Sequence, residues 1–219
     1  MKSKIFGMVV TLVFAFSVVA SGAEKGMRSL LIYGDSLSAA YGMAEDDGWV
    51  ALLELKIQQE NRPYRVVNGS VSGETSTGGL ERLPSMLRSY NPDIVVLELG
   101  GNDGLRGLPL PLLKNNLRQM IALIHQSGAK TLLSGIQIPP NYGPRYATPF
   151  YELFYQIAEE DEVAFIPFLI DGIPQHPELM QDDGIHPTPE AQPIILENVW
   201  NYLLPMLEGS STSLTELSD

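Results

Sequence analysis

A short apolar run that ends in a glycine and delivers a serine constrains the fold of this chain more than any other stretch. The run from Leu30 to Tyr33 is followed directly by Gly34, Asp35 and Ser36. Such a run is typical of a strand buried on both faces of a parallel sheet. Open parallel sheets bind ligands at the carboxyl ends of their strands, so Ser36 is expected at that edge.

Strand-like and helix-like segments alternate along the rest of the chain. Apolar runs predict strands at 29–34, 64–68, 93–99, 130–136 and 163–165, and helical periodicity predicts helices from Trp49 and at 78–90, 109–127, 149–160 and 193–207. Asp46 and Asp47 are expected to cap the helix that starts near Trp49. Right-handed crossovers between such elements give one three-layer α/β/α domain, with a central parallel sheet of about five strands in flavodoxin-like order.

The N-terminus has the organisation of a secretory signal peptide. Lys2 and Lys4 precede an uncharged apolar run, and small residues lead to an expected cleavage after Ala23. The run of about 16 residues is shorter than the roughly 20 that a membrane span needs. We therefore expect a signal peptide at 1–23, a folded domain at 24–208, a disordered tail at 209–219, and export to the periplasm or beyond.

The charge of the chain narrows its possible partners, and the absence of cysteine excludes disulfides. The chain has 14 Lys+Arg against 26 Asp+Glu, a net charge of −12, and no Cys. An acidic surface disfavours nucleic acid and anionic lipid as partners, and stability must come from the core without disulfides. We expect a monomer that neither binds nucleic acid nor inserts stably into a membrane.

Three residue types that act together in nucleophilic catalysis occur at strand ends and in one downstream loop. Ser36 would be the nucleophile, His186 its general base, and Asp183 the carboxylate that orients the imidazole. The Ser36 amide, expected at a turn leading into a helix, would stabilise an oxyanion together with the Gly73 amide and the Asn102 side chain.

Each of these residues also has a purely structural interpretation. Ser36 could cap a helix, and Asp183 could belong to an ordinary turn. Asp182 is a poorer orienter because of its spacing, while His125 and His176 are expected to be structural or solvated. Glu98, inside a predicted strand, is expected to be a buried, hydrogen-bonded carboxylate without a catalytic role. The order and placement of the motifs together favour the catalytic interpretation.

Four ordered blocks resemble those of the SGNH, or GDSL, family of serine hydrolases. They are Gly34-Asp35-Ser36-Leu37, the segment around Gly73, Gly100-Gly101-Asn102-Asp103, and Asp183-Gly184-Ile185-His186-Pro187. Residues 95–107 and 138–146 resemble the bacterial periplasmic subgroup of multifunctional acyl-CoA thioesterases, lysophospholipases and arylesterases.

The resemblance implies a serine esterase and thioesterase that works through an acyl-enzyme without metal or cofactor. It assigns Ser36, Asp183 and His186 to catalysis, and Ser36, Gly73 and Asn102 to the oxyanion hole. Its substrates would be acyl esters and thioesters, including lipids. An acetylesterase acting on carbohydrate and a non-catalytic binding module remain as alternatives.

Two apolar segments near the predicted sheet edge are expected to form a groove for the acyl chain. The residues expected to bind substrate there are Leu105, Leu108, Ile138, Pro139 and Tyr142. Each methylene buried in such a groove contributes about 0.8 kcal/mol.

Overall fold

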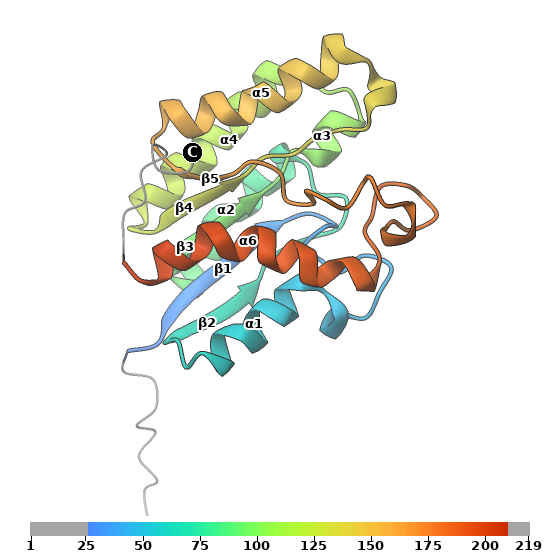
Figure 1. Cartoon of the computed structure of the whole chain (residues 1–219). Coiled ribbons are helices and arrows are strands. Elements are labelled where there is room, and N and C mark those ends of the chain that lie inside the picture. Colours follow the sequence, from blue (N-terminus) through green and yellow to red (C-terminus); the bar gives the residue numbers. More distant parts are fainter. Residues whose placement is uncertain (1–25, 210–219) are drawn as a thin grey trace, which may run out of the picture.

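Five parallel strands form the sheet at the centre of the protein, in the order β2-β1-β3-β4-β5 (Figure 1). They are β1 (Arg28–Gly34), β2 (Tyr64–Asn68), β3 (Ile94–Glu98), β4 (Lys130–Ser134) and β5 (Ala164–Ile166). This confirms the predicted flavodoxin-like sheet. The computed structural model describes residues 26–209, so the predicted signal peptide and nearly all of the predicted tail lie outside the described residues.

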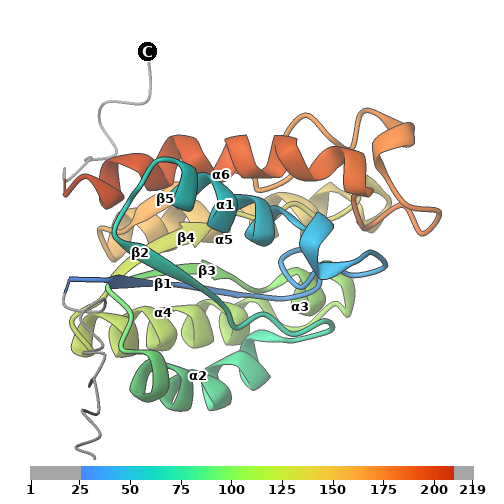
Figure 2. The same cartoon turned by 90° about the horizontal axis from the view of Figure 1, so that it is seen from below.

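Helices cover both faces of the sheet and complete three layers (Figure 2). One face carries α1 (Trp49–Gln59) and α6 (Gln192–Leu207), and the other carries α2 (Ser76–Tyr90), α4 (Leu110–Gln126) and α5 (Pro144–Glu160). A short helix, α3 (Gly101–Leu105), follows β3 at the edge of the sheet. Within residues 26–209, no helix combines the length and the apolar character that crossing a membrane requires.

The alternation of side chains along the central strands builds two separate cores. Leu31 and Tyr33 of β1 pack towards α2, α4 and α5, whereas Leu30 and Ile32 pack towards α1 and α6. The same alternation in β3 divides Val95 and Leu97 from Ile94 and Val96. Because successive strand residues point to opposite faces, Glu98 lies on the side of α1 and α6.

Three local predictions were wrong. Asp46 and Asp47 form a short 3-10 helix, η1 (Glu45–Asp47), and Gly48 precedes α1 without a side-chain cap. The α5 helix begins at Pro144, because proline is compatible with a first helical turn, and Pro149 lies inside it. The residues after Ser36 form turns, and the next helix of three residues or more is η1.

Candidate active site

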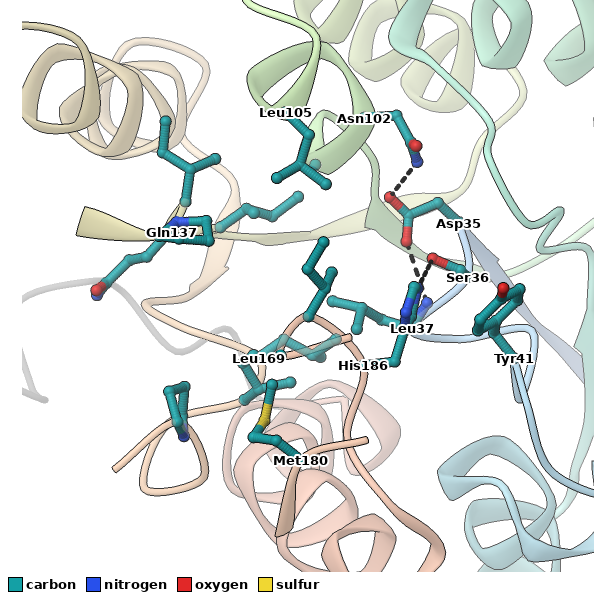
Figure 3. Close-up of a pocket in the computed structure, with 18 of the residues that line it drawn as sticks. Asp35, Ser36, Leu37, Tyr41, Asn102, Leu105, Gln137, Leu169, Met180 and His186 are labelled. Atoms are coloured by element: carbon teal, nitrogen blue, oxygen red, sulfur yellow. Dashed lines mark hydrogen bonds between the residues drawn. The ribbon is translucent and has the colours of Figure 1, made fainter. Parts of the chain in front are cut away.

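The loops that follow all five strands meet at one edge of the sheet and enclose a cavity of about 580 Å³ (Figure 3). Ser36 reaches it from β1, Gly73 from β2, Asn102 from β3, and Ile138 from β4. His186 enters from the long connection between β5 and α6. Parallel strands end on the same side, so residues that are far apart in sequence converge here.

Ser36, His186 and Asp183 form one continuous hydrogen-bonded chain. Nε2 of His186 lies 2.8 Å from Oγ of Ser36, and Nδ1 lies 2.6 Å from Oδ2 of Asp183. With the Nδ1 proton donated to the carboxylate, Nε2 is free to accept the serine proton. The geometry suits a nucleophile, a general base and an orienting group.

The carboxylate of Asp183 is held in its ionised form. Burial by itself would raise its pKa, but three hydrogen bonds outweigh this effect and lower the pKa to about 2. They come from the His186 ring and from the backbone amides of His186 and Ile185, which both donate to Oδ1. The three-residue spacing lets one short loop supply all of these donors.

The loop that carries His186 is fastened to the segment after Ser36. Met180 and Pro187 form an isolated antiparallel bridge, and the Gln181 amide nitrogen, Nε2, donates to the carbonyls of Pro187 and Tyr41, each at 2.9 Å. The Tyr41 ring lies 4.3 Å from the imidazole of His186, measured between ring centroids. Tyr41 and Gln181 were not identified from the sequence, because nothing local in either segment indicates that they meet.

Gly73 and Asn102 line the cavity beside Ser36, as an oxyanion hole requires. Gly73 has φ of +79°, a conformation that glycine adopts without strain, and its carbonyl accepts a 3.0 Å hydrogen bond from Arg106. Nδ2 of Asn102 donates to Oδ2 of Asp35 at 3.1 Å, which fixes the orientation of the amide. The roles of Ser36, Gly73 and Asn102 as oxyanion donors remain predictions.

Two buried carboxyl groups lie beneath the nucleophile turn. Oε2 of Glu98 accepts hydrogen bonds from the Asp35 amide at 3.2 Å and from the Ser38 hydroxyl at 2.8 Å. Burial raises the pKa of Asp35 to about 6 and the pKa of Glu98 well above its usual range. The sequence predicted that Glu98 is buried and hydrogen-bonded, and the structure confirms both.

Asp103 fixes the helix that follows the Gly73 loop. Its carboxylate accepts the Ser76 backbone amide at 2.8 Å and the Ser76 hydroxyl at 2.6 Å, at the first residue of α2. The Asn116 side chain donates to the same hydroxyl at 3.0 Å. The last residue of the third block therefore joins α3, α2 and α4. A role could be assigned from the sequence to the neighbouring Asn102 but not to Asp103, because nothing local indicates that Asp103 meets Ser76.

Only part of the predicted groove is observed. Leu105, Ile138 and Pro139 line the cavity, but Leu108 and Tyr142 do not. Tyr142 instead donates its hydroxyl to the Leu105 carbonyl at 2.9 Å, and the Leu108 carbonyl accepts the hydroxyl of Tyr146. The sequence missed the opposite apolar wall, which comes from the connection between β5 and α6: Phe168, Leu169, Ile170, Pro174, Met180 and Ile185.

The remaining candidates lie away from the reacting atoms. His125 is exposed on α4, and His176 is exposed in a loop, where its ring faces Glu178 at 3.4 Å. Asp182 is exposed and borders a shallower hollow beside the His186 loop. Over residues 26–209, no group of three or more His, Cys, Asp or Glu side chains is arranged to hold a metal ion.

Comparisons with known proteins agree with this arrangement. Residues 32–193 match the model of the GDSL-like lipase/acylhydrolase family. The esterase TesA of Pseudomonas aeruginosa is 50% identical over 184 residues, covering 84% of this chain and 92% of that protein. Thioesterase 1/protease 1/lysophospholipase L1 of Escherichia coli is 41% identical over 198 residues, covering 90% and 94% respectively.

A solved structure shows that the similarity extends to the fold. The crystal structure of TesA superposes with a TM-score of 0.80 at 50% identity, over 82% of this chain and 99% of that chain. The family model spans the strand that delivers Ser36, the glycine-rich loops and the loop that carries His186. This chain belongs to the GDSL-like lipase/acylhydrolase family and is an ester hydrolase.

Proposed function

We propose that this enzyme hydrolyses fatty acyl esters and thioesters through an acyl-enzyme on Ser36. The observation that carries the proposal is the unbroken chain from Asp183 through His186 to Ser36, with both links shorter than 3 Å, at the end of an apolar cavity. Medium or long acyl chains would lie between Leu105 and Ile138 on one side and the wall after β5 on the other.

The chemistry proceeds in two half-reactions. Oγ of Ser36 attacks the carbonyl carbon while Nε2 of His186 takes its proton, and Asp183 stabilises the resulting imidazolium. The amides of Ser36 and Gly73 and the Asn102 side chain stabilise the oxyanion of the tetrahedral intermediate. His186 then protonates the departing alcohol or thiol, which leaves the acyl group on Ser36. Water, deprotonated by His186, releases the carboxylic acid and restores Ser36.

The substrate class is inferred from the walls of the cavity and from the relatives. Nine of the side chains that line it are aliphatic or aromatic and lie on the β4 and β5 connections: Ile136, Ile138, Pro139, Phe168, Leu169, Ile170, Pro174, Met180 and Ile185. Each methylene that they remove from water contributes about 0.8 kcal/mol to binding. The relatives are named esterase, thioesterase and lysophospholipase, which supports the same classes of substrate here.

We also propose that the enzyme acts in the periplasm or outside the cell as a monomer. The basic start, apolar run and small-residue exit at residues 1–23 support export. The signal peptide is tested by N-terminal sequencing of the exported protein, which should begin at Glu24. A mature protein that keeps Met1 would contradict it.

The hydrolytic mechanism is tested with p-nitrophenyl esters of increasing acyl length. The mature enzyme should prefer medium or long chains, and Ser36→Ala should abolish the activity while leaving the thermal unfolding unchanged. A preference confined to acetate would favour an acetylesterase, and activity that survives Ser36→Ala would contradict the mechanism.

The groove is tested by two substitutions, one at the last residue of α3 and one in the loop that follows it. Leu105 lines the cavity and Leu108 does not, although both are half-buried. Leu105→Trp should fill the groove and shift the preferred ester to shorter acyl chains, whereas Leu108→Trp should leave the preference unchanged. Equal shifts in both variants, or none in either, would contradict the proposed acyl path.

A further inference from the structure

Glu98 ends β3 directly beneath the turn that presents Ser36, and it is fully buried. The strand register pairs it with Gly34 of β1. A Cβ atom at position 34 would overlap Oε2 of Glu98 and come within 2.9 Å of the Ser38 hydroxyl. The glycine before the nucleophile thus leaves room for a carboxyl group that the reaction itself does not use.

The two oxygens of Glu98 have different surroundings. Oε2 accepts two hydrogen bonds, from the Asp35 amide and from the Ser38 hydroxyl. Oε1 is buried and has no hydrogen-bond partner among residues 26–209. Two donors therefore hold one oxygen, while the other is left in an environment that disfavours a charge.

Asp35 has the opposite arrangement, because both of its oxygens have donors. Oδ1 accepts the Leu37 amide at 3.1 Å, and Oδ2 accepts Nδ2 of Asn102 at 3.1 Å. An amide nitrogen carries two hydrogens. One hydrogen of Asn102 is thus used by Asp35, and the other remains for the oxyanion.

Asp35 and Glu98 are neighbouring buried carboxyl groups, and ionisation of one disfavours ionisation of the other because like charges repel. Burial raises the pKa of Glu98 well above its usual range, and the negative charge of Asp35 raises it further. The pKa of Asp35 rises less, to about 6, because burial is opposed by its hydrogen bonds to Leu37 and Asn102 and by the charge of His186, although Asp103 raises it. Burial and mutual repulsion therefore favour a single negative charge on the pair, carried by Asp35.

We propose that Glu98 is a positioning residue that acts as a neutral carboxylic acid. Through Oε2 it holds the turn that carries Ser36, and it leaves the single negative charge of the pair on Asp35, which orients the Asn102 amide. The inference deepens the proposed function and rests on it only for the role of Asn102 as an oxyanion donor.

The protonation of Glu98 is tested by denaturant unfolding of the wild type and Glu98→Gln between about pH 5 and pH 9. In the unfolded chain a glutamate ionises near its ordinary pKa of about 4.3. If the folded protein keeps the proton, the unfolding constant of the wild type rises by up to about tenfold per pH unit relative to Glu98→Gln. The ionisation of Asp35 should affect the stability of both proteins equally, because a glutamine and a protonated glutamate at position 98 are both uncharged.

A matched control removes a carboxyl group from the exposed face of α2. Glu81→Gln should keep a pH-independent ratio to the wild type, because Glu81 is exposed in the folded protein. If Glu98→Gln gives the same flat ratio, Glu98 ionises as readily in the folded protein as in the unfolded chain, and the proposal is wrong. This measurement needs no substrate, so it does not depend on the proposed function.

The positioning role is tested by kcat and KM for a p-nitrophenyl ester. Glu98→Ala should lower kcat about a hundredfold with little change in KM, because the turn that carries Ser36 loses its support. Glu98→Gln should restore most of that loss, since its side-chain oxygen can accept the same two hydrogen bonds. Asp35→Asn should be the more damaging amide substitution, because it removes the charge that orients Asn102.

Two results would overturn this assignment. A folded Glu98→Gln protein that is as inactive as Glu98→Ala would show that a charged carboxylate is needed at position 98. An active Asp35→Asn with an inactive Glu98→Gln would place the charge on Glu98 and the proton on Asp35.

Discussion

The two sides of Ser36 use carboxyl groups in opposite ways. On the open side, the Asp183 side chain is 38% exposed, and its hydrogen bonds lower its pKa to about 2. On the closed side, Asp35 is 3% exposed and Glu98 is fully buried, and burial raises the pKa of both. The same chemical group is thus kept charged beside the base and partly neutral beneath the nucleophile.

The difference follows first from burial, which is nearly complete for Asp35 and Glu98, and then from the donors that each carboxyl group meets. Three hydrogen bonds from one short loop stabilise the charge of Asp183, whereas Oε1 of Glu98 meets none among the described residues. Environments that separate the pKa values of neighbouring acids also separate their roles. We therefore expect the open side to stabilise the protonated imidazole of His186, and the closed side to fix the turn that carries Ser36.

The largest effect is expected on the open side. Asp183→Asn should lower kcat about 10⁴-fold. An asparagine amide does not fix the tautomer of His186 in which Nδ1 carries the proton and Nε2 is free to accept one. Ester hydrolysis under saturating substrate measures this effect. Asp182→Asn is the matched control, since Asp182 is the exposed neighbour and lies away from the imidazole. An equal loss in both variants would show that the charge of the loop matters rather than the hydrogen bond to His186.

The next largest effect on kcat is expected for Asn102, whose amide is oriented by Asp35 on the closed side. Asn102→Ala should lower kcat by about 10²–10³, the typical cost of removing one oxyanion donor, with KM nearly unchanged. Asn201→Ala, on the exposed face of α6, should have no effect on either constant. If Asn102→Ala raised KM and spared kcat, Asn102 would contact the substrate rather than the transition state.

Much of this site could be predicted because parallel strands bring their carboxyl ends together. The runs that end at Gly34, Asn68 and Leu99 indicated three neighbouring strands, so Ser36 and Asn102 could be placed at one edge. The spacing of Asp183 and His186 similarly predicted that one turn presents both side chains. These inferences depend on local pattern and topology alone.

Contacts between distant loops were beyond the reach of the same reasoning. Gln181 donates to the carbonyl of Tyr41 across 140 residues of sequence, and no periodicity relates the two segments. Tyr142 was taken as an acyl contact because its ring is apolar, but its hydroxyl supports the Leu105 loop instead. The surroundings of Glu98, whose Oε1 is buried without a hydrogen-bond donor among the described residues, are visible only in the packed structure.

Smaller effects, on stability, are expected from alanine substitutions at two glycines: Gly34 on the closed side and Gly184 on the open side. At position 34 an added Cβ would overlap Glu98, whereas at position 184 it would meet no atom within 4 Å. Gly34→Ala should destabilise the protein by about 1–3 kcal/mol through overpacking. Gly184→Ala should cost about 1–2 kcal/mol for a different reason, because its φ of +66° is unfavourable for alanine.

The cause of each loss can be separated by a second substitution. In a Glu98→Ala background, Gly34→Ala should be less destabilising, because the side chain that it would overlap is gone. The cost of Gly184→Ala should be the same in both backgrounds. Denaturant unfolding of the three single and two double variants measures these differences, and a Gly34→Ala cost that is unaffected by Glu98→Ala would rule out the overlap.

The smallest effect is the pH dependence of stability on the open side, and it should have the opposite sign to that of Glu98. The folded pKa of Asp183 is about 2, below the value of about 3.9 expected in an unfolded chain. Its ionised form therefore stabilises the folded protein above about pH 4, and this stabilisation is lost as the pH falls through 2.

Thermal unfolding of the wild type and Asp183→Asn should accordingly differ by a constant amount from pH 7 to about pH 5, and the difference should shrink between about pH 4 and pH 2. Solvent screens a side chain this exposed, so the change should be smaller than a buried carboxylate would give. For Glu98→Gln the difference from the wild type should instead grow as the pH rises above about 4.3. Two variants that changed over the same pH range would show that one environment, not two, controls the carboxyl groups around Ser36.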